Sequence, residues 1–420
     1  MTYFCLAMPG FRRLRHLLIC SAAWIAAPGI AAPLPPASRI DIPVALDQGA
    51  SITIEVAWPE NRTPRALVVV VPGSGGVADP YLGSELKRAA YDPDSRGGTT
   101  ASLLAAGYAV AYYGQRGYAL PRTCIRGDTP AARAASFVQH CVDYRLRAGV
   151  SLSSITADTG RVFTALREHP RTGKLRQIAL PFSEGMHHVS VLAGQGAIQP
   201  AGIVSIGGPQ VPVSHVAWYQ TSREHFAALA RKAFARCPDK QLTVEKIFSC
   251  AGSPGTPPQL DRMREFAGGE VLSREFLPLR QQMFRDIYRL GLHDKVLPEN
   301  AILSASFEGH PMPVGWNLRY AQEQQNANKT TLEQLGPYTG KVIYLFGAQD
   351  YFFPLPAPGP CRVEGAKTSA PADCSVKLVD GVSHGLEDAG GFPPGAVLDE
   401  VVRALDDVNA AAARPEGQVR

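Results

Sequence analysis

The sequence predicts an α/β protein built on a mostly parallel central sheet with helices on both faces. Residues 66–71 are six consecutive apolar residues, a run typical of a strand that is buried on both faces. Similar short apolar runs recur along the chain and alternate with segments of helical periodicity. Several of these runs end in glycine-containing turns, as expected where a chain leaves the carboxyl edge of a parallel sheet.

The predicted elements follow one another in the order that such a sheet requires. Two half-exposed strands come first, at 40–44 and 52–56, because apolar and polar residues alternate there. The predicted buried strands are 66–71, 108–113, 178–180, 201–206, 341–346 and 376–379, and the main helices are 99–107, 154–169, the segment after Ser183, and 397–411. Residues 413–420 are predicted to be a disordered tail.

A helical pattern replaces this alternation between residues 216 and 337. Apolar residues recur there at spacings of three and four, which predicts one apolar helix face made of Phe276, Leu279, Met283, Ile287 and Leu290. We therefore expect 216–337 to be a helical lid inserted into a core formed by 33–215 and 338–412. Such a lid is expected to pack over the sheet edge at which the loops converge.

Length and charge limit the classes of protein to consider. The 420 residues suffice for one large α/β domain with an insertion, or for two ordinary domains. Lysine and arginine number 42 against 37 aspartates and glutamates, and without the three arginines of residues 1–32 the balance is 39 to 37. This balance gives no reason to expect binding to nucleic acid or to an anionic membrane surface.

Residues 1–32 have the pattern of a secretory signal peptide. Arg12, Arg13 and Arg15 precede an uncharged run at 17–27, and small residues follow, with cleavage expected near Ala31 or Ala32. The alternative is a membrane anchor, but the run is shorter than the roughly 20 residues that span a bilayer. We predict a secreted or periplasmic protein with no membrane span after signal removal.

The six cysteines beyond the leader fall into three local couples. An even number grouped in this way favours disulfides in an exported chain. A zinc site would need closely spaced pairs such as Cys-x2-Cys, which are absent, so we expect no metal. The predicted disulfides are Cys124–Cys141, Cys237–Cys250 and Cys361–Cys374.

Ser183 is the candidate nucleophile. It follows a short apolar run that stops at Pro181 and Phe182, and a helical pattern begins directly after it. A serine on such a strand-turn-helix elbow projects its hydroxyl, and Gly185 leaves room for the tight turn. The alternative is that Ser183 only caps the following helix.

Two further side chains can complete a catalytic triad. Asp350 and His384 each follow a predicted strand, and loops at the carboxyl ends of parallel strands share one edge. Serine needs a base to take its proton and an acid to orient that base, and the chain order Ser, Asp, His suits this architecture. The rival bases are His187 and His188. The rival to Asp350 as the acid is Asp380.

The oxyanion donors and the pocket residues complete the predicted site. The amides of Ser74, in the glycine-rich loop after 66–71, and of Glu184 are the expected oxyanion donors. We also expect Gly75, Tyr81, Phe182 and His187 to line the substrate pocket. The rival bases are disfavoured because a side chain one helical turn along points away from the nucleophile.

Taken together, the chain resembles the α/β-hydrolase superfamily, and within it bacterial serine esterases of the dienelactone-hydrolase and serine-aminopeptidase-like group. The resemblance covers most of residues 65–400 and is carried by VVVVPGSGG, YYGQRGY, PFSEGM, AGIVSIGGP, GWNLRY, LFGAQD and GVSHG. It implies an α/β-hydrolase fold with Ser183 as nucleophile, His384 as general base and acid, and Asp350 as the orienting carboxylate.

The elbow departs from the Gly-His-Ser-Glu-Gly-Gly form of these relatives at three positions. Pro181, Phe182 and Met186 stand where glycine, histidine and glycine are usual, so the elbow must be packed differently. Gln115 also replaces the aspartate of the turn after the second buried strand. None of the four changes removes a proton-transfer group.

The function expected from these residues is that of an exported serine hydrolase. It would cleave small-molecule carboxylic esters through an acyl-enzyme and would use no cofactor. One alternative is a peptidase or acyltransferase acting with the same triad. Another is a catalytically silent hydrolase fold that serves as a binding protein, since the elbow is altered.

Overall fold

The computed structural model of the chain divides it into two units, Met1–Leu34 and Pro35–Arg420. The described residues are 38–74, 99–127, 132, 136–137, 139–253, 255, 257–293, 304–307, 310–313, 318–362, 371, 373–388 and 393–413. The predicted signal peptide, the predicted tail apart from Ala413, and the predicted pocket residues Gly75 and Tyr81 lie outside them.

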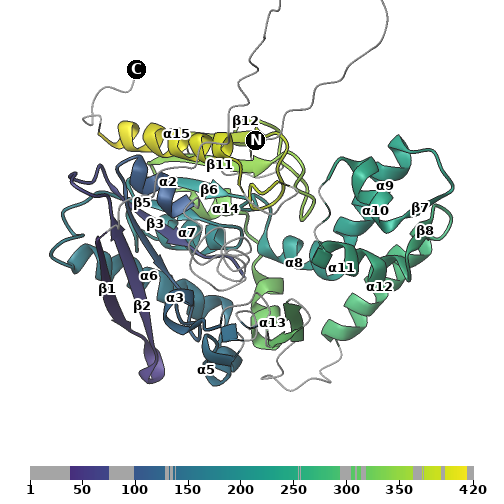
Figure 1. Ribbon diagram of the computed structural model, residues 1–420, viewed down its shortest axis with the longest axis horizontal. Coiled ribbons are helices and arrows are strands. Elements are labelled where there is room, and N and C mark those ends of the chain that lie inside the picture. Colours follow the sequence, from purple (N-terminus) through teal and green to yellow (C-terminus); the bar gives the residue numbers. More distant parts are fainter. Residues whose placement is uncertain are drawn as a thin grey trace, which may run out of the picture. The chain divides into compact units, whose positions relative to one another are not determined.

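A nine-stranded, mostly parallel sheet forms the centre of the fold (Figure 1). Its strands are β1 (Ser38–Ala45), β2 (Ser51–Trp58), β3 (Leu67–Val71), β4 (Ala109–Tyr113), β5 (Gln177–Pro181), β6 (Gly202–Ile206), β11 (Lys341–Gly347), β12 (Gly359–Pro360) and β13 (Cys374–Val379). Their order is β1-β2-β4-β3-β5-β6-β11-β13-β12. The pairs from β4 to β13 are parallel, and β1, β2 and β12 pair antiparallel at the two edges.

The helices within the described chain flank the sheet or belong to the segment between β6 and β11. They are α2 (Thr99–Ala105), α3 (Pro121–Cys124), α5 (Tyr144–Ala148), α6 (Leu152–Glu168), α7 (Gly185–Gly194), α8 (Val213–Thr221), α9 (Glu224–Arg236), α10 (Val244–Ala251), α11 (Pro257–Ala267), α12 (Leu277–His293), α13 (Leu318–Asn326), α14 (Thr331–Leu335) and α15 (Gly395–Ala412). A short 3-10 helix, η1 (Asp47–Gly49), joins β1 to β2. Two small ribbons pair β7 (Gln241–Thr243) with β8 (Val271–Ser273), and β9 (Ser304–Phe307) with β10 (His310–Pro313).

The central strands are apolar on both faces because helices cover both. In β3, Leu67, Val69 and Val71 pack in one hydrophobic cluster with residues of α6, α7 and α14. Val68 and Val70, which alternate with them, pack in a second cluster with residues of α2 and α15. This two-sided burial explains the unbroken valine run and confirms the predicted fold class.

The described part of the segment between β6 and β11 contains the helices α8 to α14 and the two small ribbons, and it has a hydrophobic cluster of its own. Side chains from α9, α10 and α11 share this cluster with Tyr351, which directly follows Asp350. Ser253 also donates to the carbonyl of Gln349 at 2.8 Å. The inserted helices therefore contact the chain at the carboxyl end of β11.

The apolar face predicted around α12 is wrong in its register. Phe276 and Leu279 are 59% and 62% exposed, whereas Leu277 is buried and Phe284 packs against the same cluster. The inner face includes Arg280, whose guanidinium donates to the carbonyls of Phe266 and Glu265 at the end of α11. A charged residue on the inner face broke the pattern. The side chains of Ile287 and Leu290 lie outside the described residues.

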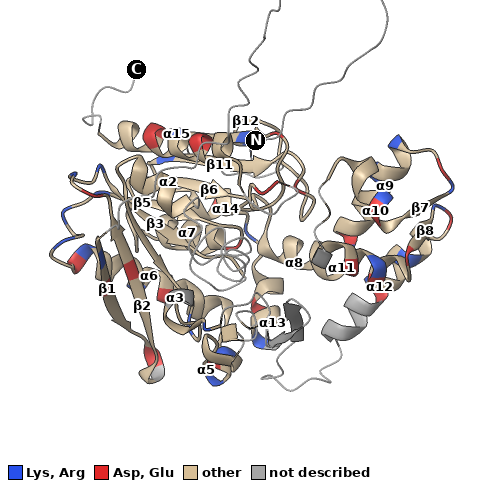
Figure 2. Cartoon of the chain, viewed as in Figure 1, with Lys and Arg blue, Asp and Glu red and all other residues tan. Residues whose placement is uncertain are grey.

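The cysteines pair as predicted, in Cys124–Cys141, Cys237–Cys250 and Cys361–Cys374. Lysines, arginines and acidic residues are interspersed over the core and the inserted helices (Figure 2). Among the described residues, none of the helices combines the length and the apolar character that crossing a membrane requires.

The disulfide Cys124–Cys141 is expected to stabilise the fold measurably. Its cysteines are 17 residues apart, and closing a loop of about that length contributes about 3 kcal/mol in the chain-entropy account. Replacing both cysteines by serine should lower the free energy of unfolding by that amount, as measured by urea denaturation. The native protein, with its disulfides verified by mass spectrometry, is the control, and an unchanged unfolding midpoint would contradict the expectation.

Candidate active site

The backbone at Ser183 has the strained geometry of a nucleophile elbow. Strand β5 ends at Pro181, α7 begins at Gly185, and Ser183 between them has φ of 49°. Residues with a side chain rarely adopt this left-handed region, so neighbouring contacts must hold the serine there. Its amide donates to the carbonyl of Ile206 at 2.9 Å.

Gly185 allows the elbow to approach β3 closely. A Cβ atom at this position would lie 2.6 Å from the carbonyl oxygen of Val71 and 2.9 Å from that of Pro72. No residue other than glycine fits there without displacing backbone atoms. The sequence prediction that Gly185 serves the tight turn therefore has a direct steric reason.

Pro181 is accommodated by a local gap in strand pairing. The β5–β6 ladder pairs Ile178 and Ala179, lapses, and resumes only at an isolated bridge between Phe182 and Ile206. Proline has no amide hydrogen to donate. It lies in the interruption of the β5–β6 pairing, where the ladder does not require a hydrogen bond from it.

Met186 is accommodated by a glycine on the next loop. The methionine is fully buried, and a Cβ atom at Gly208, just after β6, would lie 2.6 Å from the Met186 Cβ. The lack of a side chain at Gly208 therefore makes room for the Met186 side chain. The two departures change the packing of the elbow and leave the serine's position intact.

The structure brings together the three side chains of the predicted triad. The His384 Nε2 atom lies 3.0 Å from Ser183 Oγ, and His384 Nδ1 lies 2.7 Å from Asp350 Oδ2. The other carboxylate oxygen of Asp350 accepts from the amide of Phe352 at 2.9 Å. With Nδ1–H donating to the carboxylate, Nε2 is free to accept the serine proton, which is the arrangement that general-base activation needs.

The rival residues lie elsewhere. Asp380 is exposed, and the carboxylate facing His384 is that of Asp350. His187 contacts Gln334 of α14 at 3.2 Å, and burial lowers its pKa to about 4. His188 Nδ1 contacts the hydroxyl of Thr156 on α6 at 2.8 Å. The predicted pocket residue His187 thus contacts α14 in the described chain.

The electrostatic surroundings of His384 favour its protonated form. Burial alone would lower the pKa of the imidazole, but the charge and hydrogen bond of Asp350, with a smaller contribution from Glu387, raise it above 6.5. Asp350 is fully buried and the His384 side chain is 15% exposed. The carboxylate would therefore stabilise an imidazolium at this position.

Aromatic rings surround the imidazole. The ring centroids of Phe352, Phe353 and Phe182 lie 4.8, 5.4 and 5.6 Å from that of His384. Phe182, a predicted pocket residue, therefore lies beside the His384 imidazole. Phe352 and Phe353 were not among the predicted site residues, although their position two and three residues after Asp350 is a signal that could have identified them.

The loop that carries Ser74 lies against the elbow. A Cβ atom at Gly73 would be 2.9 Å from the carbonyl oxygen of Phe182 and 3.0 Å from the Ser183 Cβ. Within the described part of the chain, the amides of Ser74 and Glu184 donate to no backbone carbonyl. Two backbone donors close to the serine are what an oxyanion hole requires.

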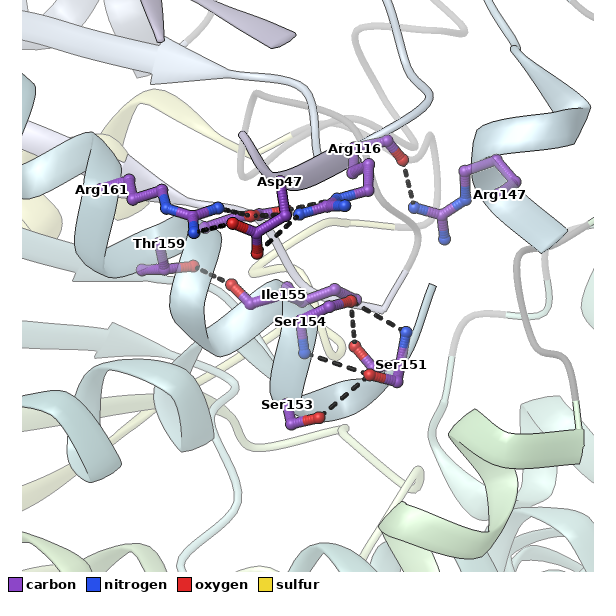
Figure 3. Close-up of polar contacts among 10 residues, drawn as sticks. Asp47, Arg116, Arg147, Ser151, Ser153, Ser154, Ile155, Thr159 and Arg161 are labelled. Atoms are coloured by element: carbon purple, nitrogen blue, oxygen red, sulfur yellow. Dashed lines mark hydrogen bonds and ion pairs between the residues drawn. The ribbon is translucent and has the colours of Figure 1, made fainter. Parts of the chain in front are cut away.

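Gln115 supports this loop, a role that the sequence did not suggest. Its Nε2 donates to the carbonyl of Gly73 at 3.1 Å. The adjacent Arg116 forms two hydrogen bonds, of 2.8 and 2.9 Å, with the buried carboxylate of Asp158 on α6, and Asp47 lies next to this pair (Figure 3). Gln115 thus ties the turn after β4 to the Ser74 loop.

No group of histidine, cysteine and acidic residues suitable for holding a metal ion occurs in the part of the chain that the structure describes. The donor atoms of the site are instead a hydroxyl, an imidazole, a carboxylate and backbone amides. Such a set can carry out acyl transfer to the serine oxygen.

The strand order, the elbow after β5 and the order Ser183, Asp350, His384 are those of the α/β-hydrolase fold. No protein-family model and no curated protein matches the chain. Among solved structures, a proline iminopeptidase from Mycobacterium smegmatis is 17% identical, with a TM-score of 0.46, over 89% of this chain and 100% of that one.

Two other solved structures are similar to the same degree. A lipase in its open form is 15% identical, with a TM-score of 0.44, over 90% of this chain and 100% of the other. A carboxyl esterase from Bacillus coagulans is 14% identical, with a TM-score of 0.44, over 89% and 99%. Likenesses of this size carry no conclusion about activity.

The raised pKa of His384 can be measured directly by NMR titration of the histidine side chains. The His384 imidazole should titrate above pH 6.5, and in Asp350→Asn its midpoint should move to lower pH because burial then acts without the opposing carboxylate. His225, whose pKa burial lowers to about 3, should stay neutral throughout and serves as the internal control. Assignment comes from the signal lost in His384→Gln, and an unchanged midpoint in Asp350→Asn would contradict the stated cause.

Proposed function

We propose that this protein is an exported serine hydrolase that cleaves carboxylic esters through an acyl-enzyme. The observation that carries the proposal is the continuous hydrogen-bonded chain from Ser183 through His384 to Asp350, with distances of 3.0 and 2.7 Å. A buried carboxylate, an imidazole and a serine hydroxyl in this order are the groups that nucleophilic acyl transfer uses.

In the acylation step, Ser183 Oγ attacks the ester carbonyl carbon while its proton passes to His384 Nε2. The carbonyl oxygen becomes an oxyanion, which the amides of Ser74 and Glu184 stabilise by hydrogen bonds. The imidazolium, stabilised by Asp350, then donates its proton to the leaving alkoxide as the carbon–oxygen bond breaks. The alcohol departs and the acyl group remains on the serine.

Deacylation repeats these events with water. His384 takes a proton from a water molecule, and the resulting hydroxide attacks the acyl carbon. Collapse of the second tetrahedral intermediate returns the proton to Ser183 Oγ and releases the carboxylic acid. Each step needs only the groups named, so no cofactor enters the balance.

Export is part of the same proposal and has separate support. The three disulfides observed are typical of proteins that fold in an oxidising compartment. The signal-like pattern of residues 1–32 agrees with this location.

The amide and ester alternatives share every atom of the triad, and they differ only in the substrate that is cleaved.

Ser183→Ala tests the assignment of the nucleophile. The native protein should hydrolyse p-nitrophenyl butyrate and react with a fluorophosphonate probe, and the variant should do neither while keeping the native circular dichroism spectrum. Loss of a triad serine lowers kcat roughly 10⁶-fold. Labelling that persists in the variant, or a native protein that the probe does not modify, would refute the proposal. A matched p-nitroanilide of the same acyl group, assayed in parallel, distinguishes esterase from amidase activity.

Gly185→Ala tests the steric basis of the elbow. Because the added Cβ would lie 2.6 Å from the Val71 carbonyl oxygen, the elbow must shift, and a displacement of about 1 Å costs roughly 100-fold in rate. The measurement is kcat for p-nitrophenyl butyrate. Gly395→Ala is the matched control, since a Cβ there meets no atom within 4 Å. Native kcat in Gly185→Ala would show that the close approach is not required.

A further inference from the structure

The carboxylate of Glu184, the residue directly after the nucleophile, is buried beneath the elbow. Its side chain accepts hydrogen bonds from the Tyr320 hydroxyl at Oε1 and from Gln324 Nε2, at 2.6 Å, at Oε2. His188 Nε2 lies 3.6 Å from Oε1. Burial would raise the pKa of this carboxyl, but His188, Tyr320 and Gln324 together lower it, so the group is ionised.

Two of these three partners come from α13, which is distant in sequence. Tyr320 and Gln324 are one turn apart on that helix, so they present their polar atoms on the same side. The Tyr320 ring is buried in a small apolar cluster with Val150, Leu152 and Ile155. The helix is therefore docked against the start of α6, and its two polar side chains reach the elbow from there.

Other contacts hold α13 in this position. Glu323 Oε2 accepts from the amide of Ser153 at the start of α6, at 2.8 Å. At the far end of the helix, the carbonyl of Ala327 accepts from the amide of Ser214 at 3.2 Å. Helix α13 is thus held against the start of α6 and against the start of α8.

A buried charge with dedicated partners constrains the backbone to which it is attached. Removing a carboxylate from water is costly, so its two hydrogen-bonding partners must stay in place. The buried guanidinium of Arg147, which donates to the carbonyl of Arg116 at 2.9 Å (Figure 3), also interacts favourably with this carboxylate. Glu184 supplies the peptide plane next to the strained serine, so fixing its side chain fixes the direction of its amide.

We propose that Tyr320 and Gln324 are positioning residues: by clamping the Glu184 carboxylate, α13 holds the Ser183 elbow and the Glu184 amide in their reactive geometry. The inference rests on the proposed function. It makes the inserted segment a part of the catalytic support in addition to any role it has over the substrate. The clamp acts through Glu184 and does not touch the reacting atoms.

The test exchanges the two members of the clamp. Glu184→Gln removes the negative charge and replaces one of the two acceptor oxygens by a donor, so the side chain can no longer accept from both Tyr320 and Gln324 as they are now oriented. The double variant Glu184→Gln/Gln324→Glu restores one donor and one acceptor at that contact and moves the charge onto α13. We expect kcat for p-nitrophenyl butyrate to fall roughly 10- to 100-fold in Glu184→Gln with KM within about twofold. In the double variant, kcat should recover at least tenfold relative to Glu184→Gln.

Two further variants separate positioning from general stability. Tyr320→Phe removes one hydroxyl and should lower kcat in the same way without a change in KM. Gln322→Glu makes the same chemical change as Gln324→Glu at an exposed position of the same helix, and should behave as the native protein. Thermal melting and amide hydrogen exchange of the peptide containing Ser183 are recorded for all variants. Faster exchange in that peptide with an unchanged melting temperature is the expected signature.

The outcomes distinguish this inference from the proposed function. If the native protein reacts with the fluorophosphonate at Ser183 and Glu184→Gln reacts at the same rate, the hydrolase assignment stands and the clamp is refuted. A loss of kcat in Glu184→Gln that the double variant does not repair would also refute it, since the complementary pair would then be irrelevant. A native protein that does not react at Ser183 overturns the proposed function and the clamp with it.

Discussion

The left-handed backbone of Ser183 is the constraint on which the site depends. An isolated serine does not favour this conformation, so contacts with the surrounding chain must raise the free energy of its other backbone conformations. The glycines at 73 and 185 let β3 and its loop come within contact distance, and the Ile206 carbonyl accepts the serine amide. The hydroxyl then points to one place, and the imidazole of His384 lies there.

The position of the imidazole follows from the sheet. Asp350 and His384 lie in the loops that follow β11 and β13, which are neighbouring parallel strands, so both loops leave the sheet at the same edge as the elbow. Burial of Asp350 makes its effect on the imidazole strong, because little water screens the pair. The electrostatics of the site are thus a consequence of strand order.

The fold, and the meeting of Ser183, His384 and Asp350, could be predicted from the sequence because their signals are local. Each buried strand is a continuous apolar run, and each of these three residues comes within a few residues of the end of such a run. The same local reasoning gave the wrong apolar face for α12. Arg280 lies on the inner face there, and its guanidinium donates hydrogen bonds to the carbonyls at the end of α11. It also missed the side chain of Glu184, because its partner Tyr320 is 136 residues away and no periodicity links the two. Gln115 was recognised as a departure from related sequences, but its contact with Gly73 depends on the meeting of two loops.

The three disulfides share a topological property. Each joins a cysteine to the next one along the chain, at separations of 17, 13 and 13 residues, so no bridge encloses or crosses another. Oxidation of these six thiols pairwise in chain order would therefore make only the three native bonds. None of these bonds has to be broken and re-formed to reach the native pairing, in contrast to chains whose native bonds are interleaved.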